Sequence, residues 1–335
     1  MAVDINIDKL ATAIVAYARI NRKVISNRFA QATEVEINKW CKTVTKIQGE
    51  YHIYDSIISH VVQGFKPEWQ PLGEWHAKDK GLKSYRQKIN FPITPAKVLG
   101  TALAELYVEN EAPEYKDITK VIIDDLLAKV DDDLDLLSFI GEYNAATASG
   151  VFGYSLDGWN TIVRNLLGNT ARPCYKIPLN ALTATNLVDQ FTQFELKLPK
   201  ILKGKIKEIH VSSHILELYS IDYRNTFGQM QDYKEADSLK SPLGKRVLVG
   251  HDNQDDDIVF CTVAGNMYRL VDLIENPAKI TDVQKQDYTI KIFADFELGY
   301  DFGINEAVVV ANFANGDEGL GDKDLMELYY PRDAA

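Results

Sequence analysis

The segment YTIKIFADFELGYDFGINEAVVVANF, residues 288–313, decides the fold because its alternation is much longer than usual. Between Ile290 and Ile304 every even-numbered residue is apolar, whereas the odd-numbered residues, Phe293 excepted, are polar or glycine. A period of two predicts a β-strand with one buried face. Such a strand would extend about 50 Å at roughly 3.3 Å per residue, whereas strands of about five or six residues are typical.

The same segment contains features that interrupt the strand. Gly299 and Gly303 predict a bend or bulge. The alternation then loses its phase at Glu306–Ala307, and the residues VVVANF that follow at 308–313 predict a separate short apolar strand. The sequence therefore predicts one very long, bent strand and a short buried strand after it.

The composition is that of a globular protein with room for two modest domains. The chain has 335 residues, of which 46% are apolar, 25% charged and 10% aromatic, close to the average for folded proteins. No apolar run approaches a membrane span, and the first residues lack the regions of a signal peptide. The cysteines Cys41, Cys174 and Cys261 are far apart, which argues against a disulfide framework or a structural zinc site and fits a reducing compartment.

The net charge of −11 is unevenly distributed along the chain. Residues 1–90 hold 14 Lys and Arg against 9 Asp and Glu, or +5, and the remainder holds 23 against 39, or −16. A basic region on an acidic body is able to bind nucleic acid or the acidic body of another copy; scattered solvated charges would give the same count. Because the basic third is also poor at forming its own core, we favour self-association.

The remaining pattern mixes helices and strands without regular βαβ alternation, which favours an α+β fold. The hydrophobic spacing predicts helices over 4–20, 34–47, 94–109, 117–144, 157–167, 183–198 and 214–227. Strands are predicted over 204–213, 245–252 and 256–263. The helix at 117–144 would be the longest, about 40 Å at 1.5 Å per residue.

Residues 64–91 indicate an extended hairpin-like loop. Aromatic residues, Trp69 and Trp75 among them, are spread among Pro, Gly and Lys, and Gly73 and Gly81 bracket a charged stretch that we expect to form the tip. Long loops in compact domains are usually functional. Exposed Trp beside basic residues is able to stack on nucleic-acid bases or to anchor a protein interface; with two Trp and few Arg, we favour the interface.

No catalytic fingerprint is present, since phosphate-binding, dinucleotide-binding, nucleophile-elbow and zinc-protease motifs are all missing. The acidic stretch 252–257 is the best candidate metal site, but it departs from a calcium loop at its sixth and twelfth positions, and a solvated turn explains it better. His210 and His214 are four residues apart, yet the switch from strand to helix at 212–213 predicts that they do not share a face. We therefore expect no catalytic, cofactor or metal residue and no enzyme.

In the order of its elements the chain resembles the major capsid proteins of tailed bacteriophages, which have the Hong Kong 97-type fold. The residues that carry the resemblance are the long helix DITKVIIDDLLAKVDDDLDLLSFIGEYN, the Gly-rich ATASGVFGY after it, IHVSSHILELYSIDYRNTFG, and the closing strand with Glu306–Ala307. The resemblance implies an N-terminal arm at 1–63, an extended hairpin loop at 64–93, a peripheral domain with the spine helix at 94–150 and 267–313, an axial domain at 151–266, and a C-terminal tail at 314–335.

The resemblance also implies a function. The chain would be a structural protein of the virion, assembled in the host bacterial cytoplasm as pentamers and hexamers into an icosahedral head around double-stranded DNA, without sequence-specific binding and without a membrane. Its partners would be itself, the portal, a decoration protein in some phages, and a separate scaffolding protein, since a 63-residue arm leaves no room for a scaffolding segment. Contacts between subunits are expected at Trp40, Trp69, Trp75, Lys78, Lys80, Lys83 and Arg86.

Three other readings remain open from the sequence. An encapsulin, a bacterial compartment with the same fold, is disfavoured by the long arm. A metal-dependent enzyme would use the acidic turn at 252–257. A nucleic-acid-binding protein would use the basic N-terminal region, and its binding would weaken with salt.

Overall fold

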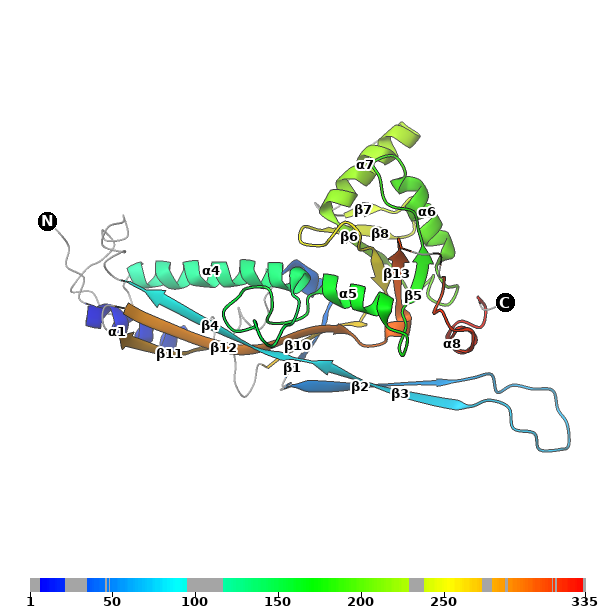
Figure 1. Cartoon of the computed structure of the whole chain (residues 1–335), viewed down its shortest axis with the longest axis horizontal. Helices are drawn as coiled ribbons and strands as arrows, with labels where there is room; N and C mark the ends of the chain where they lie inside the picture. Colours follow the sequence, from blue (N-terminus) through cyan, green and yellow to red (C-terminus); the bar gives the residue numbers. More distant parts are fainter. Residues whose placement is uncertain are drawn as a thin grey trace.

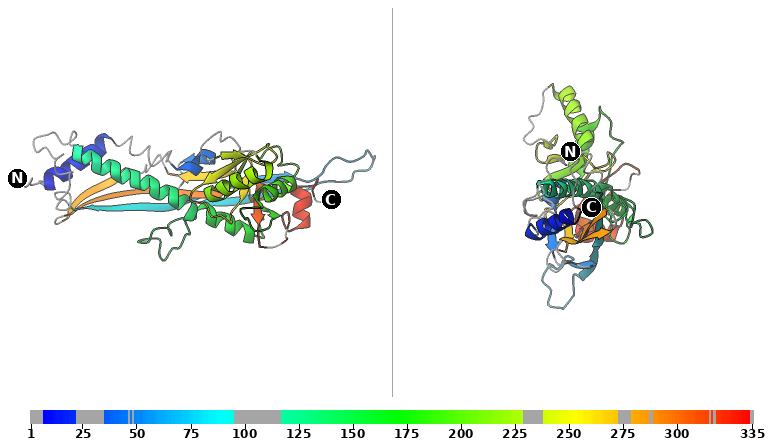
Figure 2. Two further views of the ribbon diagram at one scale, coloured as in Figure 1. Left: turned by 90° about the horizontal axis from the view of Figure 1, so that it is seen from above. Right: turned by 90° about the vertical axis from the view of Figure 1, so that its left-hand side faces the viewer.

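The computed structural model shows an elongated subunit with three distinct parts (Figure 1). It describes residues 7–21, 35–45, 47, 49–94, 117–228, 238–272, 279–286, 289–314, 316 and 318–333. A long helix lies along long strands in one half, a mixed unit of helices and strands rises over the other half, and a hairpin projects beyond it. Figure 2 shows that the hairpin continues the long axis, at the opposite end from the N-terminal helix α1 (Ile7–Ile20).

The predicted long strand exists and is the centre of a five-stranded sheet. It is β12 (Thr289–Phe302), and every even-numbered residue in it from Ile290 onward is buried. The other strands are β1 (Lys42–Thr45), β4 (Tyr85–Ile93), β10 (Met267–Val271) and β11 (Lys279–Gln286). β4 pairs antiparallel along one side of β12, β10 and β11 pair antiparallel along the other side, and β1 adds to β10 in parallel.

Gly299 lies inside β12 without the expected bulge. The pairing with β10 keeps its register through Leu270 and Gly299, so of the two predicted alternatives, a bend or a bulge, the bulge is excluded at this residue. Glycine is required for another reason: a Cβ at this position would lie 2.2 Å from the carbonyl oxygen of Lys83 at the root of the hairpin. The chain does bend at Gly303, one residue after the strand ends.

Helix α4 (Asp117–Ile140) lies along the long sheet and supplies much of the first hydrophobic core. The predicted stripe is buried in full, at Ile123, Leu127, Val130, Leu134 and Leu137. The helix ends at Ile140, before the predicted end at 144. At the next residue, Gly141, a Cβ would lie 2.6 Å from the carbonyl oxygen of Leu156 and 3.0 Å from the amide of Gly158, because the following loop returns directly against the helix end.

A six-stranded sheet separates the first core from a second one. Its strands, in spatial order, are β5 (Tyr175–Pro178), β13 (Val308–Asn312), β9 (Phe260–Thr262), β6 (Glu208–Ser212), β8 (Val247–His251) and β7 (Ser238–Lys240). Successive residues of a strand point to opposite faces, and in β13 Val308 and Val310 belong to the first core whereas Val309 and Ala311 belong to the second. The predicted short apolar strand is therefore buried on both faces.

Most predicted helices of this half are present with shifted ends. They are α5 (Trp159–Gly168), α6 (Leu187–Lys197) and α7 (Ser213–Phe227), with the 3₁₀ turn η4 (Asn305–Ala307) and helix α8 (Lys323–Tyr329) near the C-terminus. Ser212 caps α7 by accepting a hydrogen bond from the amide of Ile215 at 3.1 Å, and Gly228 ends the helix with a φ of 66°. Within the described residues no helix is long and apolar enough to cross a membrane.

The predicted helix at 34–47 is wrong. The chain forms a 3₁₀ helix, η1 (Glu36–Trp40), and then β1, whose residues pair with β10 from Lys42–Tyr268 onward. The β-branched residues Thr43, Val44 and Thr45 suit this pairing, so the long-range contact prevails over the local helical spacing. The helix predicted at 94–109 lies outside the described residues.

Strand pairing crosses the limits expected for the hairpin loop and for the sheets. The hairpin consists of β2 (Glu50–Ile58) and β3 (Trp75–Lys83), which pair residue for residue from Glu50–Lys83 to Ile58–Trp75. Its first strand thus lies in the region assigned to the arm, and residues 74–81, expected at the tip, belong to β3. β4 belongs to the long sheet, and β13, assigned to the peripheral part, completes the six-stranded sheet.

Candidate assembly surfaces

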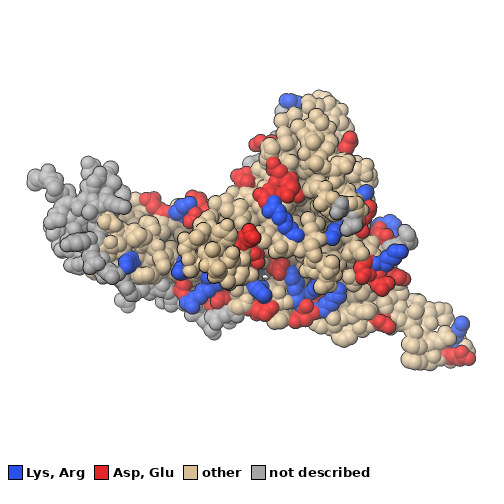
Figure 3. Space-filling view, in the orientation of Figure 1, with Lys and Arg blue, Asp and Glu red and all other residues tan. Residues whose placement is uncertain are grey.

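The tip of the hairpin exposes a run of apolar side chains that nothing in the described chain covers. Residues 59–74 connect the two strands, and Val62, Phe65 and Trp69 in this loop are 90%, 94% and 87% exposed. Trp75, at the start of β3, is exposed as well. Figure 3 shows the projecting hairpin as mostly uncharged surface with a few charges at its far end. Clustered exposed apolar residues mark interaction sites.

Lys80 fixes the middle of strand β3 to the end of β12. Its Nζ donates hydrogen bonds to Asp301 Oδ1 at 2.8 Å, to the carbonyl oxygen of Phe302 at 2.6 Å and to Asn305 Oδ1 at 2.7 Å. These three bonds use all the donors of an ammonium group. Burial lowers the pKa of Lys80 and raises that of Asp301 from their ordinary values, so the pair gains from its hydrogen bonds in a site that disfavours isolated charges.

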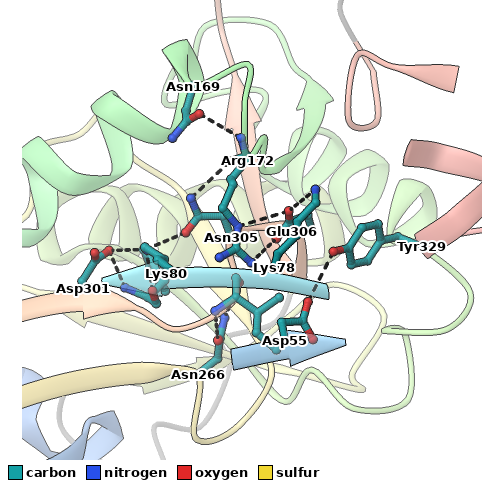
Figure 4. Close-up of polar contacts among 12 residues, drawn as sticks. Asp55, Lys78, Lys80, Asn169, Arg172, Asn266, Asp301, Asn305, Glu306 and Tyr329 are labelled. Atoms are coloured by element: carbon teal, nitrogen blue, oxygen red, sulfur yellow. Dashed lines mark hydrogen bonds and ion pairs between the residues drawn. The ribbon is translucent and has the colours of Figure 1, made fainter. Parts of the chain in front are cut away.

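Glu306 is the second anchor and is completely buried (Figure 4). Its carboxylate accepts hydrogen bonds from Lys78 Nζ at 3.2 Å and from Arg172 Nη2 at 3.3 Å. Arg172 in turn accepts a bond at its carbonyl from Asn305 Nδ2 at 3.1 Å. We name this group the hairpin latch. It consists of Lys78, Lys80, Arg172, Asp301, Asn305 and Glu306.

The C-terminal helix closes the outer side of the latch. Tyr329 donates a hydrogen bond to Asp55 Oδ2 on β2 at 3.3 Å, and Lys78 Nζ lies 5.5 Å from the centre of its ring. The hydroxyl of Tyr330 donates to the carbonyl oxygen of Glu306. Both strands of the hairpin are therefore tied to the body, mainly by polar contacts.

The residues predicted to contact neighbouring subunits divide into two groups. The ammonium groups of Lys78 and Lys80 face the body of their own chain, because alternate residues of β3 point to it; their contact with a neighbouring subunit stays a prediction. Trp40 is partly buried, with its ring centre 5.3 Å and 5.2 Å from those of His210 and His251.

The other predicted contact residues lie at the surface. Trp69, Trp75 and Lys83 are exposed, and Arg86, with 70% of its side chain exposed, pairs with Asp295. Their contacts with a neighbouring subunit stay predictions. Sequence reasoning missed the latch residues Arg172, Asp301 and Asn305, which are partly or fully buried, because nothing in their local pattern distinguishes them from surface residues.

A large groove runs beside the outer strand of the long sheet. It has a volume of about 1220 Å³ and lies between β4, helix α4, the loop 143–155 and the middle of β12. Its apolar lining includes Ile89, Phe91, Leu126, Val130, Val151 and Phe152. Val151 and Phe152 are half exposed on its rim, so the groove offers an apolar surface to a partner.

The acidic turn at 252–257 is engaged by the protein itself. Arg164 Nη2 lies 2.6 Å from Asp255 Oδ2 and 3.0 Å from Asp257 Oδ1. The Asp256 carboxylate accepts a hydrogen bond from the Ser212 hydroxyl, and its Oδ2 lies 2.8 Å from His214 Nδ1. Burial acts to raise the pKa of Asp256, but these two contacts outweigh it and the pKa is lowered. In the described part of the chain no three potential ligands gather at one point.

No protein-family model matches the sequence, and no curated protein matches it either. Solved structures do match the fold. A chain of the procapsid of satellite phage P4, with its size determination protein, is 11% identical and superimposes with a TM-score of 0.53 over 88% of this chain and 98% of that chain.

Two further capsid structures agree. The capsid of Myoviridae phage XM1 matches at 8% identity and a TM-score of 0.54, over 83% of this chain and 90% of that chain. The capsid of the empty GTA particle matches at 10% identity and a TM-score of 0.51, over 84% and 90%. Each of these structures covers more than four fifths of this chain. The chain therefore has the Hong Kong 97-type α+β fold of phage capsid proteins.

Proposed function

We propose that this chain is the major capsid protein of a tailed bacteriophage. It is a structural protein that assembles as pentamers and hexamers into an icosahedral head around double-stranded DNA. The observation that carries the proposal, beside the fold, is the projecting hairpin: its root is anchored by buried charges, whereas its tip exposes Phe65 and Trp69 almost completely. A monomeric protein gains nothing from ordering so long an uncovered apolar element.

The two apolar surfaces give the assembly a direction. The hairpin tip lies at one end of the long axis, and the groove beside β4 lies on the body of the subunit. When the tip of one copy enters the groove of the next, the contact is heterologous, and repeated heterologous contacts close into rings. Closure with five and with six copies then supplies the two kinds of ring that a shell requires.

The assignment of the parts follows from this role. The long sheet and α4 form the peripheral domain, the six-stranded sheet with α6 and α7 forms the axial domain at the centre of each ring, and the basic N-terminal region serves as the arm. The portal, a separate scaffolding protein and, in some heads, a decoration protein are the proposed partners in the host cytoplasm. DNA contact is non-specific, as suits a chain of net charge −11.

Replacing both Trp69 and Trp75 by alanine tests the proposal. With phage lysate as the source of the scaffolding protein, we expect wild-type protein to form shells of uniform size in electron micrographs. The double variant should remain as folded subunits under the same conditions, because its interface loses two aromatic anchors. Val151→Asp with Phe152→Asp, which places charge on the groove rim, should have the same effect. Ile140→Ala serves as the control, because it removes an exposed apolar side chain from the end of α4, outside the hairpin tip, the groove and the proposed axial domain.

The outcomes separate the parts of the proposal. Normal shells from the Trp69→Ala, Trp75→Ala variant would refute the role of the hairpin. Normal shells from the groove variant alone would keep the assembly role of the hairpin but show that its tip binds a surface other than the groove. Wild-type protein that stays monomeric in phage lysate, where the proposed scaffolding protein is present, would contradict assembly as the function.

A further inference from the structure

A buried pair of histidines joins three parts of the subunit that are far apart in the sequence. His210 on β6 and His251 on β8 are 3% and 0% exposed, and His210 Nδ1 lies 2.9 Å from His251 Nε2. The two rings are nearly parallel, with their centres 5.2 Å apart. Neither residue belongs to the hairpin, the groove or the latch, so the assembly role leaves this pair unexplained.

Aromatic rings from other elements enclose the pair. The edge of Trp40, the last residue of η1, meets both imidazoles at nearly right angles. Phe139 of α4 lies 5.2 Å from His251, and Phe260 of β9 stacks at 4.9 Å on His210. Segment Glu36–Trp40 is therefore held against the spine helix and the six-stranded sheet at this one cluster.

The geometry admits one proton more readily than two. A hydrogen bond between two imidazole nitrogens needs one N–H and one lone pair. His251 Nδ1 makes no hydrogen bond within the described residues and lies 3.7 Å from Glu36 Oε2. A proton there gives an imidazolium that faces a carboxylate and still donates to His210. A second proton, on His210, would set two N–H groups against each other in a buried site.

The charged groups around the histidine pair also bear on how many protons it holds. On η1, the Glu36 carboxylate faces His251. On α4, Asp135 accepts hydrogen bonds from the Glu36 amide at 3.3 Å and from Asn253 Nδ2 at 2.8 Å, and burial raises its pKa. Arg269 on β10 is buried near Cys41 and Tyr300. Burial and the neighbouring His251 hold the pKa of His210 well below its ordinary value.

We propose that the His210–His251 pair is an acid-sensitive joint that holds Glu36–Trp40 on the body of the subunit with at most one proton and releases this segment when the second proton enters. Release removes Trp40 from the pair and moves the pKa of His210 upward toward its ordinary value of about 6.5, whereas in the held state His210 resists protonation. The holding free energy is therefore complete above about pH 6.5 and declines as the pH falls below it. Because one extra proton is bound on release, the equilibrium constant for release rises by up to about tenfold for each unit by which the pH falls.

Trp40 reports on the joint directly. The unassembled full-length chain, with Trp69→Phe and Trp75→Phe to remove the exposed tryptophans, is titrated from pH 8 to pH 4.5 while tryptophan emission, acrylamide quenching and circular dichroism are recorded. We expect emission to shift to longer wavelength and quenching to increase below pH 6.5 while circular dichroism stays constant. The same titration with Trp40→Phe added should show no change, since Trp159 remains buried in the first core.

The matched variants are His210→Asn, which cannot take up the second proton, and His214→Asn, which removes the exposed histidine paired with Asp256. We expect the transition to disappear in His210→Asn and to stay unchanged in His214→Asn. If His210→Asn does not fold, the wild-type titration decides alone. Constant Trp40 emission down to pH 4.5, or emission that changes only together with circular dichroism, would overturn the proposal.

Discussion

Glu306→Ala should destabilise the subunit strongly, because Glu306 is the one carboxylate that Lys78 and Arg172 share. Its side chain has no exposed surface, and Lys78 Nζ and Arg172 Nη2 lie 3.2 Å and 3.3 Å from it. Removing one partner of a buried ion pair costs about 3–5 kcal/mol, since the remaining charge is left without compensation. The side chains of Lys78 and Arg172 keep 27% and 13% exposure and are able to turn partly to water, so we expect a value near the lower limit, about 3 kcal/mol.

Urea unfolding of the unassembled subunit measures this loss. The midpoint should fall in Glu306→Ala without a change in slope. Glu318→Ala is the matched control: Glu318 pairs with Lys197 at 3.1 Å, with the two side chains 47% and 33% exposed, and pairs near the surface contribute less than about 1 kcal/mol. In a Lys78→Met background the cost of Glu306→Ala should shrink, because one uncompensated cation is gone. Equal losses in Glu306→Ala and Glu318→Ala would refute the latch as a source of stability.

Two further predictions concern packing and the cysteines. Gly299→Ala should lower the free energy of unfolding by roughly 3 kcal/mol, the upper end for overpacking, because its Cβ would lie 2.2 Å from the Lys83 carbonyl oxygen. Gly168→Ala is the control, since its Cβ would have no neighbour within 4 Å and the variant should be neutral. Equal urea midpoints for the two variants would contradict the close approach at Gly299. Burial raises the pKa of Cys174 to about 11 and of Cys41 to about 12, and that of Cys261 rises as well. All three thiols should therefore react slowly with a disulfide reagent at pH 8 and rapidly in urea, and one thiol reacting at the free rate in the native subunit would disprove this.

The long strand and the spine helix could be predicted because each follows one simple period over many residues. The even-numbered residues of 290–302 and the stripe from Ile123 to Leu137 are buried as their spacing indicates. The segment 34–47 has an equally regular helical spacing, but its last residues pair with β10. That pairing joins residues more than two hundred positions apart, and no local pattern records it.

The hairpin shows the same limit at the level of the site. Its aromatic content and its role as an exposed element could be predicted from residues 64–91, since Trp and Phe among Pro and Gly have no local core to enter. Its strand β2 was missed, because alternate residues of Glu50–Ile58 are only partly buried and the residues between them are exposed. The inward direction of Lys78 and Lys80 depends on Asp301 and Glu306, which come from a segment that meets β3 only in the folded chain.

The latch fixes the hairpin to the body at Lys78 and Lys80, so a rotation at these residues displaces the far end of the hairpin. On β3, Lys78 lies three residues from the Trp75 end of the strand, or about 10 Å at roughly 3.3 Å per residue, so a rotation of about 6° at Lys78 displaces that end by about 1 Å. Small adjustments among Lys78, Lys80 and their carboxylates are thus amplified into the position of Phe65 and Trp69. How precisely the ion pairs of the latch fix the orientation of β3 therefore decides how precisely the hairpin tip is positioned.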